Sequence, residues 1–262
     1  MFLESLANNS EIYFLIFARI IALFMTSPVL SNDSVPGVVR NSLALMITIV
    51  IFPFAKDYMI PDSGVGFVFV ALGEVILGII TGFFISIIFS VFQLAGQMFA
   101  VQMGFGASQV YDPLAQVEIP VIGQLFNFIA LFIFITTGAF QKIFIIGILR
   151  SIEFVKATDL IVEQELLLGS AITSISTLFS QSLIISFPIL GTLILLSVTM
   201  GLLAKAAPQM NLMMIGFPIQ IAVGFVMIAF SLPFLMEKFA IIIDNNFYFI
   251  AEIFSKVANY GK

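Results

Sequence analysis

The stretch LLLGSAITSISTLFSQSLIISFPILGTLILLSVTMGLLA, residues 166–204, contains no charged side chain. It lies between Glu165 and Lys205 and is 39 residues long. A helix needs about 20 apolar residues to cross the hydrocarbon core of a bilayer. The whole chain has the same character, because 61% of its 262 residues are hydrophobic and 10% are charged, whereas soluble domains carry roughly 25% charged residues. The sequence therefore predicts an integral membrane protein.

Helix is the expected structure of every apolar segment, because backbone exposed to lipid must satisfy its own hydrogen bonds. Six such segments cover residues 12–30, 38–55, 65–95, 119–149, 172–203 and 212–236, and an amphipathic tail is expected at 239–257. We therefore predict an all-α membrane protein that forms a single domain over residues 1–262. Residues 75–111 and 166–203 fit one crossing poorly, so we expect kinked or broken helices there that pack partly on protein.

The composition also argues against several classes of function. The chain contains no cysteine and no histidine, which excludes disulfides and removes the commonest general base and metal ligand. The apolar segments contain no paired carboxylates, so we expect no enzymatic activity, no metal and no cofactor. Ten Lys and Arg stand against fifteen Asp and Glu, and no basic block is present that would bind nucleic acid.

Small residues recur at four-residue intervals in and after the third segment: Gly78 and Gly82, then Gly96, Ala100 and Gly104. Such spacing lets two helix backbones approach closely, which is a common way for helices to pack in lipid. Two interpretations stay open, namely packing within the chain and a surface for other subunits. The same region carries amide side chains at Gln93, Gln97 and Gln102. Amides need polar partners, so this helix should face protein or water.

Glu74 and Arg19 are the ionisable residues nearest to the interior of an apolar segment. We expect Glu74 to lie near the start of its helix at a depth that faces water, because Pro61 and Gly64 precede it closely. The alternative is a proton relay, which would require several ionisable partners.

The segment from Met103 to Pro113 has the most unusual local chemistry. Its glycines permit close approach and positive φ, and Asp112 before Pro113 disfavours continued helix. One interpretation is a plain connector between helices. The other is a plug, because an apolar constriction blocks ions by excluding water. The candidate plug residues are Phe105, Gly106, Ala107, Ser108, Gln109, Val110, Tyr111, Asp112 and Pro113.

A second unusual segment, GLLAKAAPQMN at residues 201–211, ends one apolar segment, and GFP at 216–218 opens the next. Pro208 cannot continue a helix, and Lys205 near a helix C-terminus interacts favourably with the helix dipole. The pattern predicts a tight helical hairpin with one fixed cation. Its candidate residues are Gly201, Lys205, Pro208, Gln209, Asn211, Gly216, Phe217 and Pro218.

With these two segments the chain resembles the FliR family, the export-gate subunits of the flagellar type III secretion system, over nearly its whole length. The resemblance implies a FliP-like and a FliQ-like portion, assembled with several copies of FliP and FliQ into a helical, pore-like gate. It also implies association with FlhB, a place in the flagellar basal body of the bacterial inner membrane, and passage of unfolded flagellar proteins. In the family the loop after Met-Gly-Phe-Gly projects into the channel as a plug, which implies that role for residues 106–113.

Two rival functions stay open. The homologous subunit of a virulence injectisome has the same architecture and exports effectors to host cells. A small-molecule secondary transporter would show inverted repeats and a polar site at the membrane midplane, and neither feature is visible in the sequence. Lys205 departs from the family pattern, which usually has arginine there, so a bidentate contact is not assumed at this position.

Overall fold

The computed structural model describes residues 9–32, 35–55, 63–105, 121–157, 159, 164–207, 209 and 212–260. Every element in this part of the chain is a helix, which confirms the predicted all-α class. The chain divides into two compact units. Unit 1 comprises Met1–Ile88, Gly138–Ile175 and Ile243–Lys262, and unit 2 comprises Phe89–Thr137 and Ser176–Ile242. Whether the two units act as one membrane domain stays a prediction.

Unit 1 begins with a hairpin of two helices, α2 (Ser10–Thr26) and α3 (Gly37–Ile51), which lie side by side and are followed by the short helix η1 (Phe52–Phe54). The part of α4 (Gly64–Gln102) up to Ile88 packs on α2. The remaining elements are α7 (Ala139–Lys142), η2 (Ile143–Arg150) and α8 (Ser151–Phe154), together with the end of α11. Because π-helix is usually limited to a single turn, the eight π-helical residues of η2 are unusual.

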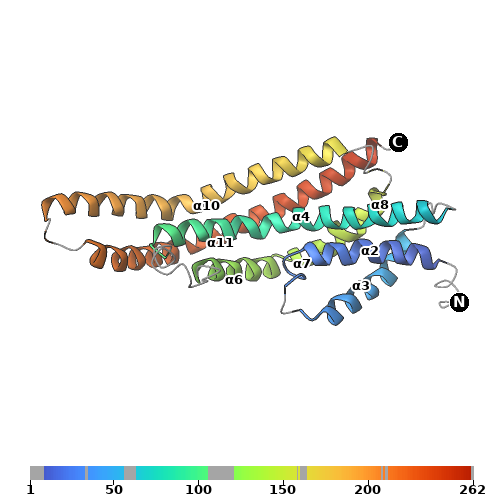
Figure 1. Cartoon of the computed structure of the whole chain (residues 1–262), viewed down its shortest axis with the longest axis horizontal. Coiled ribbons are helices and arrows are strands. Elements are labelled where there is room, and N and C mark those ends of the chain that lie inside the picture. The colour runs from blue at the N-terminus through green and yellow to red at the C-terminus, as the bar shows by residue number, and fades with distance from the viewer. Residues whose placement is uncertain are drawn as a thin grey trace. The chain divides into compact units, whose positions relative to one another are not determined.

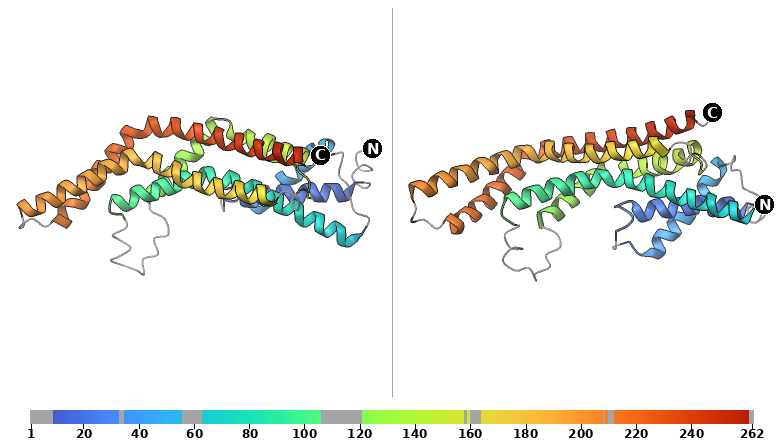
Figure 2. Two further views of the ribbon diagram at one scale, coloured as in Figure 1. Left: turned by 90° about the horizontal axis from the view of Figure 1, so that it is seen from above. Right: turned by 45° about the horizontal axis from the view of Figure 1, so that its top comes forward.

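Unit 2 contains the end of α4, α6 (Val121–Thr136), and parts of α10 (Gln164–Ala206) and α11 (Leu212–Tyr260). In Figures 1 and 2 the parts of α10 and α11 in this unit run side by side as a helical hairpin. Four buried phenylalanines form its core: the ring centroids of Phe92 and Phe239 are 3.5 Å apart, and those of Phe99 and Phe126 are 4.9 Å apart. Such rings bury large apolar areas and so dominate core energetics.

Of the kinked or broken helices predicted at residues 75–111 and 166–203, no break occurs within α4 or α10. Residues 75–102 lie in α4 and residues 166–203 lie in α10, which runs through Pro188 without interruption, whereas residues 106–111 lie outside the described residues. Pro188 has no N–H to donate to the carbonyl of Ile184, and the hydroxyl of Thr192 donates to the carbonyl oxygen of Pro188 itself at 2.9 Å. The residues of the expected amphipathic tail, 239–257, belong to α11, which runs through Pro218 and Pro233.

The predicted segment 119–149 is interrupted within its described residues. The helix α6 ends at Thr136 and α7 begins at Ala139. Between them Gly138 has a φ of 69°, a left-handed conformation that glycine adopts without the steric cost of a side chain. A single apolar run therefore forms two helices, which belong to different units.

Four helices in the described part of the chain are long and apolar enough to cross a membrane, and a fifth span arises if α6 and the α7–α8 series count as one. At 1.5 Å per residue, α4 with 39 residues and α10 with 43 are about 58 and 64 Å long. The hydrocarbon core of a bilayer is about 30 Å thick. Each helix is therefore about twice as long as one straight crossing requires.

Glycines allow the close contact between α4 and α2 in unit 1. A Cβ atom added at Gly78 would overlap the carbonyl oxygen of Arg19 and lie 3.1 Å from the backbone nitrogen of Leu23. One added at Gly82 would overlap the hydroxyl of Thr26. The two glycines thus form a groove on α4 that holds the backbone of α2, the packing mode of small residues in membrane helices.

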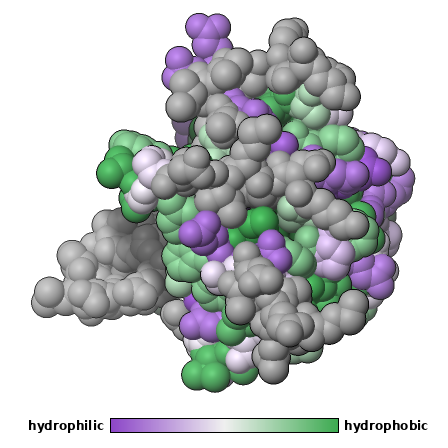
Figure 3. Space-filling model, turned by 90° about the vertical axis from the view of Figure 1, so that its right-hand side faces the viewer, coloured by the Kyte–Doolittle hydropathy of each residue, from purple (hydrophilic) through white to green (hydrophobic). Residues whose placement is uncertain are grey.

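The end of unit 1 where α2 begins and α11 ends is mixed in polarity. Figure 3 shows separate groups of hydrophilic side chains at this end, with hydrophobic ones between them. A surface that faced only lipid tails would lack such groups, because polar side chains are costly in hydrocarbon. We infer that this end of the unit meets water or polar protein.

Candidate functional site

Arg19 on α2 is buried in unit 1 and binds two other segments of that unit. Its Nε donates to Oε2 of Glu74 on α4 at 2.5 Å. Its Nη1 donates to the carbonyl and hydroxyl oxygens of Ser151 at 2.7 and 3.1 Å, and its Nη2 donates to the carbonyl oxygen of Val155 at 2.9 Å. Val155 follows the last residue of α8, where backbone acceptors need partners and favour a cation, and Ser151 is the first residue of this short helix. One guanidinium therefore joins α2, α4 and α8.

The expectation that Glu74 faces water is wrong, because its side chain is 0% exposed. It lies ten residues after Gly64, the first residue of α4. Its Oε1 atom is buried and has no hydrogen-bond partner in the described part of the chain. A relay needs a series of ionisable groups, whereas the hydrogen bonds of Arg19 given above lead on to backbone carbonyls and a hydroxyl. The geometry gives the pair a structural role in unit 1.

In unit 2, α4 ends in a Schellman motif at the first of the two sequence motifs. The backbone N–H of Phe105 donates to the carbonyl of Ala100 at 3.0 Å, and that of Gly104 donates to the carbonyl of Val101 at 3.1 Å. Gly104 has a φ of 89°, the left-handed conformation that this motif requires after the helix. Gly104 is therefore the point at which the chain turns away from α4.

The second sequence motif supplies the residue that packs on this turn. A Cβ atom added at Gly104 would lie 2.5 Å from Cδ1 and 2.9 Å from Cε1 of the Phe217 ring. Phe217 belongs to α11. The two motifs that the sequence singled out, far apart along the chain, thus meet in unit 2, and the contact depends on the absence of a side chain at Gly104.

A small polar cluster lies beside this contact and joins three helices of unit 2. The amide nitrogens of Gln102 on α4 and Gln220 on α11 donate to the hydroxyl oxygen of Ser197 on α10, at 3.2 and 3.1 Å. The same hydroxyl donates to the carbonyl of Leu193 at 2.9 Å. It uses one proton and two acceptor positions, which is the full capacity of a hydroxyl. Gln102 thus has the polar partner that the sequence predicted for the amides of this helix.

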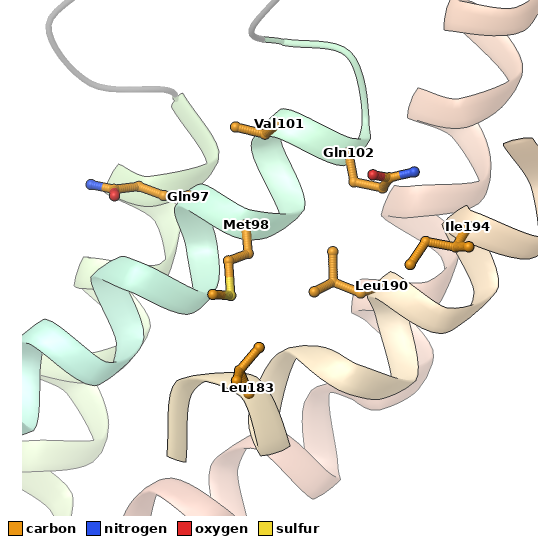
Figure 4. Close-up of a pocket in the computed structure, with 7 residues that line it drawn as sticks. All are labelled: Gln97, Met98, Val101, Gln102, Leu183, Leu190 and Ile194. Atoms are coloured by element: carbon orange, nitrogen blue, oxygen red, sulfur yellow. The ribbon is translucent and has the colours of Figure 1, made fainter. Parts of the chain in front are cut away.

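A shallow apolar groove of about 390 Å³ lies next to Gln102 in unit 2. Figure 4 shows its wall of α4 side chains facing a second wall from α10. The lining residues are Gln97, Met98, Val101, Gln102, Leu183, Leu190 and Ile194. None of these side chains is titratable, so the groove is suited to apolar contact and not to acid–base chemistry.

The remaining predicted site residues are distributed as follows. Gly96 packs on α6, because a Cβ atom there would lie 3.2 Å from Cα of Gly123, and Ala100 is buried. The glycines of the small-residue ladder are thus in contact with helices of their own chain. Residues 106–113, the predicted plug, lie outside the described residues, and so do Pro208 and Asn211.

The predicted hairpin between the fifth and sixth apolar segments is present. The helix α10 ends at Ala206, one residue after the exposed Lys205, and α11 begins at Leu212. Gln209 is an exposed turn residue in the connection. Gly201 has no neighbouring atom where a side chain would lie, and Gly216 has only Met200 at 3.8 Å. The two glycines of the hairpin motif thus lack the close packing that Gly104 has against Phe217.

Comparison with known proteins identifies the family. A model of the family described as "Bacterial export proteins, family 1" matches residues 11–245. The chain belongs to this family of bacterial export proteins. The curated relatives of this export protein include the flagellar biosynthetic protein FliR of Borreliella burgdorferi, 29% identical over 83% of this chain and 81% of the relative. Those of Escherichia coli and Bacillus subtilis are 28% and 25% identical, over 94% and 86% of this chain and 94% and 88% of the relatives.

Sequence reasoning missed three residues of this site: Ser197, Gln220, and Gly224 of α11, where an added Cβ atom would lie 2.6 Å from Cε of Met103. A signal was present for two of them, since Phe217, Gln220 and Gly224 follow the i, i+3, i+7 spacing of one helix face. Ser197 gave no such signal, because α10 contains many serines and threonines at similar spacing. Its role depends on which hydroxyl comes to lie between two amides.

Proposed function

We propose that this export protein is a flagellar biosynthetic protein of the FliR type, a structural subunit of the gate through which unfolded flagellar proteins leave the cytoplasm. The observation that carries this proposal is the family match over residues 11–245, together with relatives from distant bacteria that align over most of the chain under that one name. The subunit acts by forming part of a conduit, and no catalytic step is assigned to it.

The proposed gate contains FliP and FliQ in several copies, associates with FlhB, and lies in the inner membrane at the flagellar basal body. Helix length and exposure support partners of this kind. Only 22% of the most apolar window of α10 is buried, although the helix has 43 residues. Lipid tails cover about 30 Å, about half of that helix. Other subunits would cover the rest of its apolar surface, since large exposed apolar areas mark interfaces.

The proposed seal of the gate is the segment Gly106–Pro113, with Val110 and Tyr111 as bulky members beside Phe105. Support comes from the described residues that lead into it, because Gly104 ends α4 in a fixed turn immediately before this segment. An apolar seal that excludes water blocks ions. The same seal can move aside for an extended polypeptide, since no covalent bond holds it.

Two experiments on the intact chain test the assignment. Deletion of the gene in its source bacterium should abolish swimming, and a plasmid copy should restore it. A tagged chain purified from native membranes should bring FliP and FliQ with it. Loss of effector delivery with normal swimming would favour the injectisome subunit, and a solitary chain that transports small molecules in vesicles would favour a secondary transporter.

A further inference from the structure

The face of α11 formed by Phe217, Gln220 and Gly224 meets the end of α4 and the turn that follows it. Phe217 lies against Gly104, and Gln220 shares the Ser197 hydroxyl with Gln102. Gly224 lies against Met103. Gln102 at the end of α4 and the turn residues Met103 and Gly104 are thus joined, directly or through Ser197, to positions on one face of α11, at the i, i+3 and i+7 spacing that two helical turns bring into line.

Two of these contacts are reciprocal in size. On the α4 side Gly104 leaves room for the ring of Phe217, and on the α11 side Gly224 leaves room for the side chain of Met103. A Cβ atom added at Gly224 would lie 2.6 Å from Cε and 2.7 Å from both Cγ and Sδ of Met103. Met103 is fully buried. A large side chain from each helix therefore fills a space that a glycine of the other helix provides.

This interlock matters because glycine does not hold a turn by itself. Gly104 adopts its left-handed conformation without steric cost, but it adopts many other conformations just as easily. The Phe217 ring occupies one side of Gly104. The residue before Gly104 is Met103, whose side chain is buried. Contacts from outside the helix thus supply the rigidity that the turn lacks.

We propose that Phe217, together with Gly224, is a positioning residue that holds the turn at the end of α4 in one orientation. The turn then directs the chain as it leaves α4, and the consequence for the seal rests on the function proposed above. Within the Gly-Phe-Pro motif of α11, the phenylalanine serves this role. Gly104 leaves the space that the phenylalanine ring occupies.

The absence of cysteine from the natural chain allows a direct test. A nitroxide spin label is attached to F105C in the full-length chain, which is purified from native membranes with the subunits that accompany it. The label should show an immobilised component, and Phe217→Ala should remove that component. The matched control is Phe230→Ala, a phenylalanine of α11 in the same unit that is 82% exposed, and it should leave the spectrum unchanged.

Compensating variants separate packing from general damage. Gly224→Ala should reduce the immobilised component, and Met103→Ala in the same chain should restore it, because the second change removes all three atoms in the way. Gly104→Ala should also reduce the immobilised component. Adding Phe217→Ala should not restore it fully, because the left-handed backbone conformation at position 104 stays unfavourable for alanine. If Phe217→Ala does not accumulate, Phe217→Leu keeps apolar bulk without the flat ring and should lose part of the component.

The proposal is overturned if Phe217→Ala keeps the immobilised component, or if the label at position 105 is already mobile in the otherwise natural chain. Ion leakage is measured in cells that carry Phe217→Ala without the label. Leakage together with a mobile turn supports both the positioning role and the seal. A mobile turn in ion-tight, swimming cells supports the positioning role and rejects the seal.

Discussion

Arg19 and Glu74 form a buried ion pair, with Nε and Oε2 2.5 Å apart and side chains that are 1% and 0% exposed. The pair connects α2 to α4, and the same guanidinium binds the end of α8. Removing one partner of a buried pair is costly, because the other charge stays buried without compensation.

Arg19→Leu should therefore destabilise the chain by about 3–5 kcal/mol. The measurement is the free energy of unfolding in detergent, from a denaturant titration followed by circular dichroism. The double variant Arg19→Leu with Glu74→Leu should recover part of this loss and not all of it, since the carbonyl of Val155 still lacks its donor. An Arg19→Leu chain as stable as the natural one would contradict the role assigned to the pair.

Glu74→Gln tests the alternative role in proton movement. The amide oxygen still accepts from Arg19, but the buried guanidinium loses its counter-charge, so stability should fall. Export by the chain that does assemble should persist, because the geometry gives Glu74 a structural role. Flagellar export per assembled complex is the readout, with assembly measured by copurification. Normal assembly without proton-coupled export would instead establish the relay.

Gly78→Ala should destabilise unit 1 by about 1–3 kcal/mol, the usual range for overpacking. Backbone atoms of Arg19 and Leu23 occupy the space and cannot rotate away as a side chain could. Gly169→Ala in α10 is the matched control, because nothing lies within 4 Å of its added Cβ atom. That change should be neutral or stabilise the isolated chain by up to about 1 kcal/mol, since alanine favours helix. Equal effects at both positions would reject the close packing of α4 on α2.

Ser197→Ala should cost roughly 1–2 kcal/mol, because two amide donors lose their common acceptor while they are partly buried. Thr199→Ala, two residues along α10, is the control. Its hydroxyl is exposed and donates to the carbonyl of Leu195 in the same helix, so its effect should stay within about 0.5 kcal/mol. The midpoints of thermal unfolding in detergent compare the two variants. Identical midpoints would show that the polar cluster does not stabilise unit 2.

Deletion of Gly106–Pro113 should leave assembly largely intact but make cells permeable to small ions. A charge that crosses the open pore gains about 2.3 kcal/mol per 100 mV of membrane potential, so leakage should be rapid. A potential-sensitive dye in growing cells gives the measurement. Replacement of the segment by glycine and serine at equal length is the control for loop length, and it should leak as well. Ion-tight deletion cells would exclude the segment from the seal.

Sequence reasoning succeeded where the signal is local. The hairpin ends at Ala206 and Leu212 follow from Pro208 and Lys205, because proline and helix-end charges act on the nearest turn. It failed at residues 166–203, where a break was among the expected outcomes and α10 instead runs through Pro188. A membrane helix tolerates proline when neighbouring groups satisfy the freed backbone, and the sequence does not show those neighbours.

The sequence by itself determined that this is an all-helical membrane protein of the bacterial export family, with two chemically unusual segments. Hydrophobic runs and glycine–proline signals are properties of neighbouring residues, so they are legible along the chain. Only the tertiary structure decided that Glu74 pairs with Arg19 across 55 residues and that Phe217 fills the space beside Gly104. These contacts join segments that are distant in sequence. Their partners depend on which helix faces pack together, and no local sequence pattern determines that packing.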